Sequence, residues 1–370
     1  MGVDWAESFV DAGWKSDQMA LWALQMPIGP RSWAWIAAKG SQAEKSYWKW
    51  ARSWASPEWT LEETKLAVAR LHAIGRDWGA LELVMSRQFH HQDVENEMLF
   101  GALERLLDSP SERRGGDMDV HHVREAIALL QQKAPADTED RLARIEWGFL
   151  SILDGFSLLP KTLQRQLARD PDFFVGCIKV MFGSKEPDED TREPDGEAGS
   201  GTKGRDEVVN EANKAQMVYR LLHDWRVIPG TNEGGEVNAE ALKDWITRAR
   251  AGCQKLDRLA VCDITIAELF AKSPSDKDGA VPLVVVRDVI EECASADMDS
   301  GLRTGYFNLR GSYMKGIYEG GQQERELAAK YDRYAEICSR WVRTAEVHRR
   351  LARQYRAEAE REDERAAARK

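Results

Sequence analysis

Residues 99–107 read LFGALERLL, and their apolar side chains recur at the positions of one helix face: Leu99, Ala102, Leu103, Leu106 and Leu107. The same period continues along the chain, at Val123, Ala126, Ile127 and Leu130, at Leu142, Ile145, Phe149 and Ile152, and at Leu242, Trp245, Ile246, Ala249 and Cys253. No comparable two-residue alternation, the pattern of a half-buried strand, appears. The sequence therefore predicts an all-α fold.

One run departs from this pattern. Residues 281–286 read VPLVVV, and their β-branched composition is typical of a strand. They lead directly into RDVIEEC, so the same residues equally fit a loop that feeds a helix. Both interpretations stay open at this point.

Prolines and glycines confine each apolar stripe to about 10 to 18 residues, the length of an ordinary helix. Thr60 and Glu63 have the spacing of a capping box, in which each side chain bonds the backbone N–H of the other residue. We expect a helix from Leu61 to near Gly75 and a second from about Asp77 to Gln88, which together form a helical hairpin.

Further hairpins fit residues 94–133 and 138–182, and this spacing of about 35 to 45 residues falls in the range of HEAT-like and TPR-like repeats. The segments share no common sequence motif, so only their regular spacing supports a repeat. A single amphipathic hairpin cannot bury its apolar stripe, whereas stacked neighbours can. The prediction is an α-solenoid-like or irregular helical-repeat array.

An acidic segment divides the chain. Residues 183–207 carry nine acidic and four basic side chains and no aromatic one. A segment this poor in apolar residues cannot offset its ordering entropy, which predicts a disordered insert or linker. It separates a Trp-rich helical block, residues 1–182, from a C-terminal helical block, residues 208–370, with a Gly-Tyr-Arg loop and two long terminal helices.

Composition narrows the class of protein. The 370 residues are 43% hydrophobic and include 14 Trp, which excludes global disorder. The 52 basic and 62 acidic residues give a net charge of −10, which argues against a nucleic-acid binder with a uniformly basic surface. No run approaches the roughly 18 uncharged apolar residues that span a bilayer, and the start lacks a secretory signal. These features and five widely spaced cysteines predict a cytoplasmic protein with reduced thiols and no membrane contact.

Two stretches are dense in aromatic residues: Trp22, Trp33 and Trp35, then Tyr47, Trp48, Trp50, Trp54 and Trp59. They fit either a stacking platform for a ligand or a hydrophobic core, and the core is the favoured interpretation. Trp48 and Trp50 lie about 200° apart on a helix, so Trp48, Trp50 and Trp54 cannot all share one face. At least one must face solvent or a neighbouring element, which makes these three residues candidate contacts.

Residues 301–325 interleave basic and aromatic side chains with six glycines. The pattern is typical of a loop that holds a phosphate or a peptide, although an ordered loop packed on the last helices is the favoured interpretation. Loops on a rigid scaffold often carry function. This segment therefore supplies the remaining binding candidates: Arg303, Tyr306, Asn308, Arg310, Tyr313, Lys315 and Arg325.

No catalytic or metal-binding pattern stands out. In the pairs His90-His91 and His121-His122, adjacent helical residues diverge by about 100°, so neither pair chelates a metal by itself. Phosphate-loop, dinucleotide-binding, hydrolase and kinase motifs are absent from the sequence. The prediction is no catalytic residue, no metal and no cofactor.

Several strings resemble the C-terminal helical region of large, poorly characterised multidomain bacterial proteins associated with phage defence. They are LPKTLQRQLARDPDFF at 159–174, YRLLHDWRVIPG at 219–230, VRDVIEE at 286–292, GLRTGYFNLRG at 301–311 and GGQQER at 320–325 with the two helices after it. The resemblance covers residues 140–368 and includes no catalytic motif. It implies a fragment or short relative of a longer protein whose effector or nucleotide-hydrolysing domain lies elsewhere.

The leading hypothesis is a non-enzymatic helical scaffold or sensor that binds a protein partner within a larger bacterial, defence-type system. The first alternative is a nucleic-acid-binding module that uses residues 301–325 and the C-terminal helix. That helix interleaves acids with its nine basic residues over 341–370, which favours internal salt bridges. The second alternative is an unrecognised metal-dependent hydrolase that uses His121, His122 and nearby carboxylates.

Overall fold

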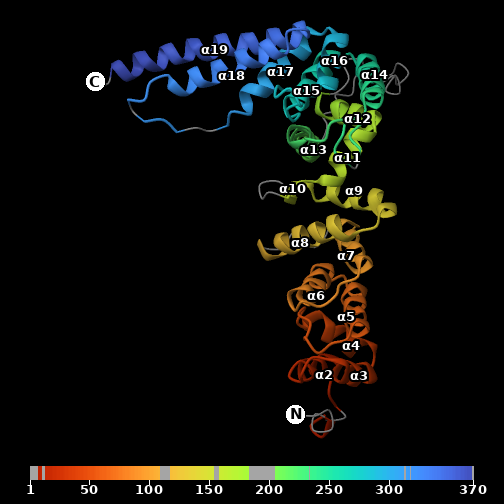
Figure 1. Cartoon of the computed structure of the whole chain (residues 1–370). Helices are drawn as coiled ribbons and strands as arrows, with labels where there is room; N and C mark the ends of the chain where they lie inside the picture. Colours follow the sequence, from red (N-terminus) through yellow and green to blue (C-terminus); the bar gives the residue numbers. More distant parts are fainter. Residues whose placement is uncertain are drawn as a thin grey trace, which may run out of the picture. The chain divides into compact units, whose positions relative to one another are not determined.

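The computed structural model describes residues 7–10, 13–108, 117–153, 158–182, 205–232, 234–311, 314–316 and 318–368. These residues form α-helices, one 3₁₀ turn (η1, Ala136–Thr138) and one isolated backbone pairing between Thr231 and Val237, with no strand among them (Figure 1). The prediction of an all-α fold is confirmed. No helix in the described ranges is long and apolar enough to cross a membrane.

The chain divides into two compact units, Met1–Thr162 and Leu163–Lys370. The second unit starts before the acidic segment because helix α12 (Pro171–Phe182) packs on α13 (Arg205–Asp224) and α14 (Ala239–Lys255). There the Phe174 ring lies 5.7 Å from the Trp225 ring and 5.2 Å from the Trp245 ring. Residues 183–204 lie outside the described residues, so their expected disorder stays a prediction. Residues 205–207 begin helix α13.

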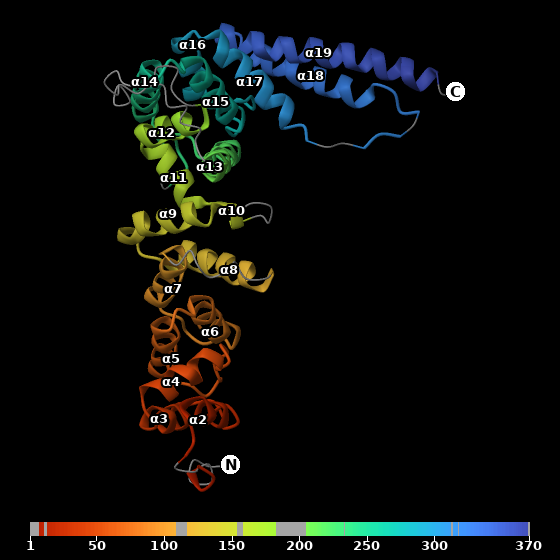
Figure 2. The ribbon, with the colours of Figure 1, turned by 180° about the vertical axis from the view of Figure 1, so that it is seen from behind.

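Unit 1 is a series of helices that pack on their near neighbours in sequence, as α5 does on α6, α6 on α7 and α7 on α8. Figure 2 shows the same helices from behind. Their bounds are α2 (Ser16–Ala23), α3 (Pro30–Ala38), α4 (Ser41–Trp50), α5 (Leu61–Ala73), α6 (Asp77–Phe89), α7 (Asn96–Asp108), α8 (Asp117–Lys133), α9 (Glu139–Gly148) and α10 (Leu150–Leu153).

The predicted hairpin of α5 and α6 is present. The Glu63 backbone N–H donates to Thr60 Oγ1 at 3.2 Å, and the Thr60 N–H donates to Glu63 Oε2 at 2.7 Å. These two bonds satisfy donors that a helix start otherwise leaves unpaired. Gly75 turns the chain at φ 74°, a value that favours glycine. The expected helix start at Leu61 and the second helix from Asp77 are confirmed.

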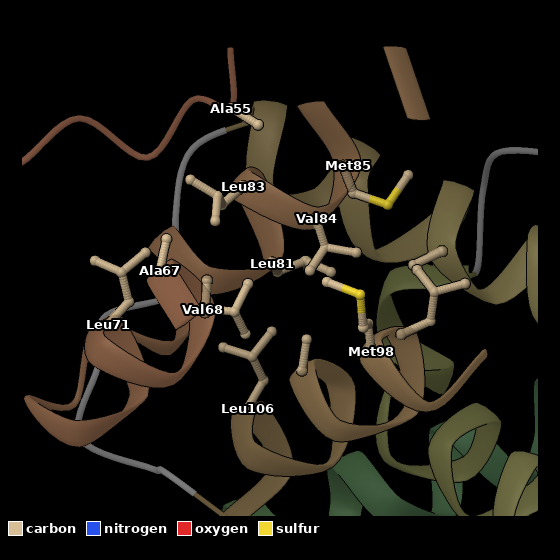
Figure 3. Close-up of a cluster of buried hydrophobic side chains, with 14 of the residues drawn as sticks. Ala55, Ala67, Val68, Leu71, Leu81, Leu83, Val84, Met85, Met98 and Leu106 are labelled. Carbon is tan, nitrogen blue, oxygen red and sulfur yellow. The ribbon is translucent and has the colours of Figure 1, made fainter. Parts of the chain in front are cut away.

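The core of unit 1 forms where the apolar faces of these helices meet. In Figure 3, Leu71 of α5, Leu81 and Val84 of α6, and Met98 and Leu106 of α7 gather in one buried cluster. Burying each such side chain contributes about 1.5 to 3 kcal/mol, an upper estimate because unfolded chains also bury some surface. The apolar residues that recur from Leu99 onward thus lie on the face of α7 that is buried in unit 1.

Unit 2 contains most of α11 (Lys161–Arg169) and the helices after it: α12 (Pro171–Phe182), α13 (Arg205–Asp224), α14 (Ala239–Lys255), α15 (Leu259–Ala271), α16 (Val284–Cys293), α17 (Ala296–Asn308), α18 (Gln322–Ile337) and α19 (Val342–Ala367). The two expected terminal helices are α18 and α19, which pack along each other. Residues 281–283 are a loop and Val284 begins α16, so the loop interpretation of this run is right and the strand interpretation is wrong.

The expected loop at 301–325 is wrong for its first third, because Ala296–Asn308 form α17. Gly301 and Gly305 lie one turn apart and let α17 approach α15 closely. A Cβ atom added at Gly301 would lie 2.6 Å from the Ile264 carbonyl oxygen, and one at Gly305 would lie 2.6 Å from Ala271 Cβ. These two glycines are present for close helix packing, whereas a loop would use them for turns.

Candidate functional site

The basic residues predicted at 310–325 form ion pairs inside unit 2. Arg310 Nη2 and Lys315 Nζ both donate to the carboxylate of Glu324, which is 0% exposed. Burial opposes its charge, but the bonds from Lys315 and Arg310 hold the pKa of Glu324 below its ordinary value. Arg325 pairs with Asp363 at 2.6 Å. The fields of these cations are therefore largely cancelled within the unit.

Other predicted residues of this segment divide between surface and interior. Arg303 and Asn308 are exposed on α17, whereas Tyr306 is buried. The Tyr306 ring lies 5.3 Å from the His348 ring, and its hydroxyl has no hydrogen-bond partner among the described residues. Burial raises the pKa of Tyr306 well above its ordinary value. Tyr313 lies outside the described residues.

Tyr306 and Arg310 line a cavity of about 300 Å³ in unit 2. Residues of α15, α17, α18 and α19 form its walls. Four lining residues are tyrosines: Tyr306, Tyr331, Tyr334 and Tyr355. Four are cations: Arg226, Lys272, Arg310 and Lys330. No described lining residue is a carboxylate. The cavity thus combines aromatic surfaces with positive charge.

The tyrosines are held in place by His348 of α19. The rings of Tyr331 and Tyr355 lie 5.7 Å apart and 8° from parallel, and the His348 ring lies 5.8 Å from Tyr331. His348 Nε2 donates to the Val281 carbonyl oxygen at 2.8 Å, because a carbonyl can only accept. The imidazole is therefore fixed behind the tyrosines that line the cavity.

The pH dependence of stability should report the buried His348. Burial lowers the pKa of His348 from 6.5 to about 4, so the folded protein binds this proton less readily than the unfolded chain. Its contribution is complete above pH 6.5 and is lost as the pH falls toward 4. Between pH 7 and 5 we expect a loss of about 2 kcal/mol in the free energy of unfolding.

Urea unfolding at both pH values measures this loss, and His348→Phe should reduce it by about 2 kcal/mol. An identical loss in wild type and His348→Phe would contradict a buried, neutral imidazole at this position.

The three predicted tryptophans have different surroundings. Trp48 is 3% exposed and packs on Trp33 in the core, with ring centroids 5.4 Å apart. Trp50 is 65% exposed at the end of α4, and Trp54 is 42% exposed beside Phe89 at 5.6 Å. Trp48 and Trp50 face opposite ways, in agreement with their angular positions on α4, whereas Trp54 lies beyond the end of that helix. The prediction that these tryptophans belong to a hydrophobic core is right for Trp48 and wrong for Trp50.

Trp50 and Leu21 lie in a groove of about 960 Å³ in unit 1, which we call the Trp50 groove. Its walls come from α2, α4 and the turn after α5. Lys45 and Lys49 line it, and Lys49 Nζ lies 5.5 Å from the centre of the Trp50 ring. The Arg76 guanidinium donates to the Ala51 carbonyl oxygen at 2.7 Å and fixes the end of α4. The groove is therefore lined by apolar side chains and by two ammonium groups.

The described residues contain no group of three or more metal-ligating side chains. His121 Nε2 lies 3.6 Å from Glu125 Oε2 at the surface of α8. No family model, curated protein or solved structure matches the chain. The two candidate sites therefore rest on their own geometry.

Sequence reasoning missed most of the cavity. Tyr331, Tyr334 and Tyr355 stand at ordinary helical positions of the two terminal helices, where a leucine would serve packing equally well. The presence of tyrosine at these three positions could have indicated a polar site, because a buried phenol needs a polar partner. Lys272 and Lys330 gave no signal, since each is a single lysine in an ordinary helical pattern.

Proposed function

We propose that the chain is a non-enzymatic helical scaffold or sensor that binds a protein partner, and that the partner docks in the Trp50 groove of unit 1. The observation that carries the proposal is the 65% exposure of Trp50 at the edge of a groove. Tryptophan is the residue most enriched at the energetic centres of protein interfaces. Trp50 lies in the same groove as a second exposed apolar residue, Leu21.

The chemistry of the groove selects the partner. Leu21, 58% exposed, and Trp50 offer apolar surface, and Lys45 and Lys49 form no ion pair with the described residues. The one acidic residue of the groove, Asp17, already accepts a hydrogen bond from Ser46 Oγ at 2.6 Å. The fitting occupant is a segment of a partner protein that carries an apolar residue flanked by acidic ones.

The helical arrangement supports a scaffold. In unit 1, each helix packs chiefly on helices close to it in sequence, as in an irregular helical-repeat array. Such an array holds surface side chains in fixed positions. The resemblance of residues 140–368 to defence-associated bacterial proteins leads us to place this scaffold in a larger system of that kind.

A protein partner also fits the C-terminal helices better than a nucleic acid. Most arginines of α19 pair with acids of the same unit, among them Arg350 and Arg353 with Glu346, Arg356 with Asp332, and Arg365 with Glu362. Paired cations release few counterions on binding a phosphate backbone, and counterion release drives such binding.

Co-purification from the source cells tests the proposal. We expect Leu21→Ser with Trp50→Ser to lower the yield of a stoichiometric partner about tenfold, since it removes about 1.4 kcal/mol or more of binding energy. Leu66→Ser with Met118→Ser is the matched control, because both residues are exposed, apolar and in unit 1. Equal recovery with the groove variant, or no stoichiometric partner with the wild type, would contradict the proposal.

A further inference from the structure

Three of the four cations around the unit 2 cavity have no carboxylate partner in the part of the chain that the structure describes. Lys272 Nζ donates only to main-chain carbonyls, those of His223 and Trp225, the latter at 3.1 Å. Arg226 and Lys330 make no ion pair with the described residues. In a chain with ten more acids than bases, this concentration of uncompensated positive charge is unusual.

The cations also act on one another. Burial and the charge of Arg226 lower the pKa of Lys272, and Glu268 and Asp224 offset this only in part. Like charges held together in a partly buried site are destabilising unless an anion joins them. The arrangement therefore favours binding of a negative group between Lys272 and Arg226.

Tyrosine side chains line the same cavity. Tyr331 and Tyr355 are nearly parallel, and Lys330 Nζ lies 5.8 Å from the Tyr331 ring and 5.6 Å from the Tyr334 ring. The buried Tyr306 hydroxyl, which lacks a partner among the described residues, is a polar group that a ligand can satisfy. An unpaired buried polar group costs about 1 to 3 kcal/mol, so pairing it would favour a ligand.

We propose that this cavity binds a small aromatic anion, a molecule that joins a planar ring to a phosphate group and is about the size of a nucleoside monophosphate. The ring packs on the tyrosines, and the phosphate contacts Lys272, Arg226 and Lys330. A volume of about 300 Å³ lies at the lower end of the range for small-molecule sites. This site is separate from the Trp50 groove and does not depend on it.

Titration calorimetry of the full chain tests the assignment. The probes are AMP, GMP, CMP and UMP, phenyl phosphate as a ring without ribose, and adenosine and inorganic phosphate as the two halves. We expect at least one aromatic phosphate to bind with a Kd below about 1 mM and about tenfold more tightly than either half.

Tighter binding of a nucleotide than of phenyl phosphate identifies the nucleotide class, and the reverse identifies simple aryl phosphates. No binding of any aromatic phosphate, or equal binding of inorganic phosphate, would overturn the proposal.

Variants locate the binding. Arg226→Gln with Lys330→Gln should weaken the tightest probe about tenfold, and Tyr306→Phe should weaken it about threefold without lowering stability. The control is Lys255→Gln with Arg303→Gln, which also removes one lysine and one arginine charge. Both residues are exposed and neither lines the cavity. This control should bind within about twofold of wild type. Equal affinity of the cavity variant and wild type would overturn the proposed location, whatever the outcome for the Trp50 groove.

Discussion

Arg287→Ala is expected to lower the free energy of unfolding by about 4 kcal/mol. The Arg287 guanidinium is fully buried and donates to the carbonyl oxygens of Pro282 at 2.7 Å and Ala280 at 2.8 Å. It also forms two bonds to Asp278, at 2.6 and 2.9 Å, and lies over the Trp341 ring at 4.7 Å. The substitution leaves these acceptors unpaired and opens a cavity, and each loss carries its own cost.

Urea unfolding at pH 7 measures this effect. Arg303→Ala is the control, since Arg303 is exposed on α17, and it should change the free energy of unfolding by less than about 0.5 kcal/mol. Arg287→Ala should also abolish binding at the unit 2 cavity, because Arg287 fixes the loop that carries Val281. A loss below about 1 kcal/mol would show that the buried guanidinium is not needed for the fold.

Gly301→Val is expected to cost about 3 kcal/mol. An added Cβ would lie 2.6 Å from the Ile264 carbonyl oxygen and 2.8 Å from Ile264 Cα, and neither backbone atom can move without shifting α15. Valine adds two methyl groups beyond that Cβ, so α17 and α15 must separate. Thermal unfolding should show a correspondingly lower midpoint.

The control for this substitution is Gly176→Ala in α12, where an added Cβ meets no atom within 4 Å. Because alanine favours the helix over glycine, this variant should be unchanged or more stable by about 0.5 to 1 kcal/mol. Equal midpoints for Gly301→Val and wild type would mean that α17 and α15 do not approach closely.

Local signals in the sequence predicted most helices. The apolar period at Leu99 and the capping box at Thr60 depend only on neighbouring residues, so they could be read without the fold. The glycines at 301 and 305 could not, since a loop and a tight helix contact both favour glycine. Only the position of Ile264 on α15 decides between the two.

The candidate sites depend on contacts distant in sequence. Lys272, directly after α15, and Lys330 of α18 line one cavity although they are far apart in the sequence. The pattern of residues along the chain does not show that these two lysines lie close together in space. Trp50 was accessible to prediction, because the angle between adjacent helical positions already separates it from Trp48. Arg310 and Lys315 were predicted as binding residues without knowledge of Glu324, the buried carboxylate that pairs with them.

The central functional claim is that Trp50 contacts a protein partner. The most direct measurement replaces Trp50 by the photoreactive residue p-benzoylphenylalanine in the source cells and identifies the crosslinked peptide by mass spectrometry. We expect one covalent adduct, to a peptide with an apolar residue among acidic ones, and no such adduct from the same replacement at the exposed Met118. No adduct at position 50, the same adduct at position 118, or crosslinking to nucleic acid would contradict it.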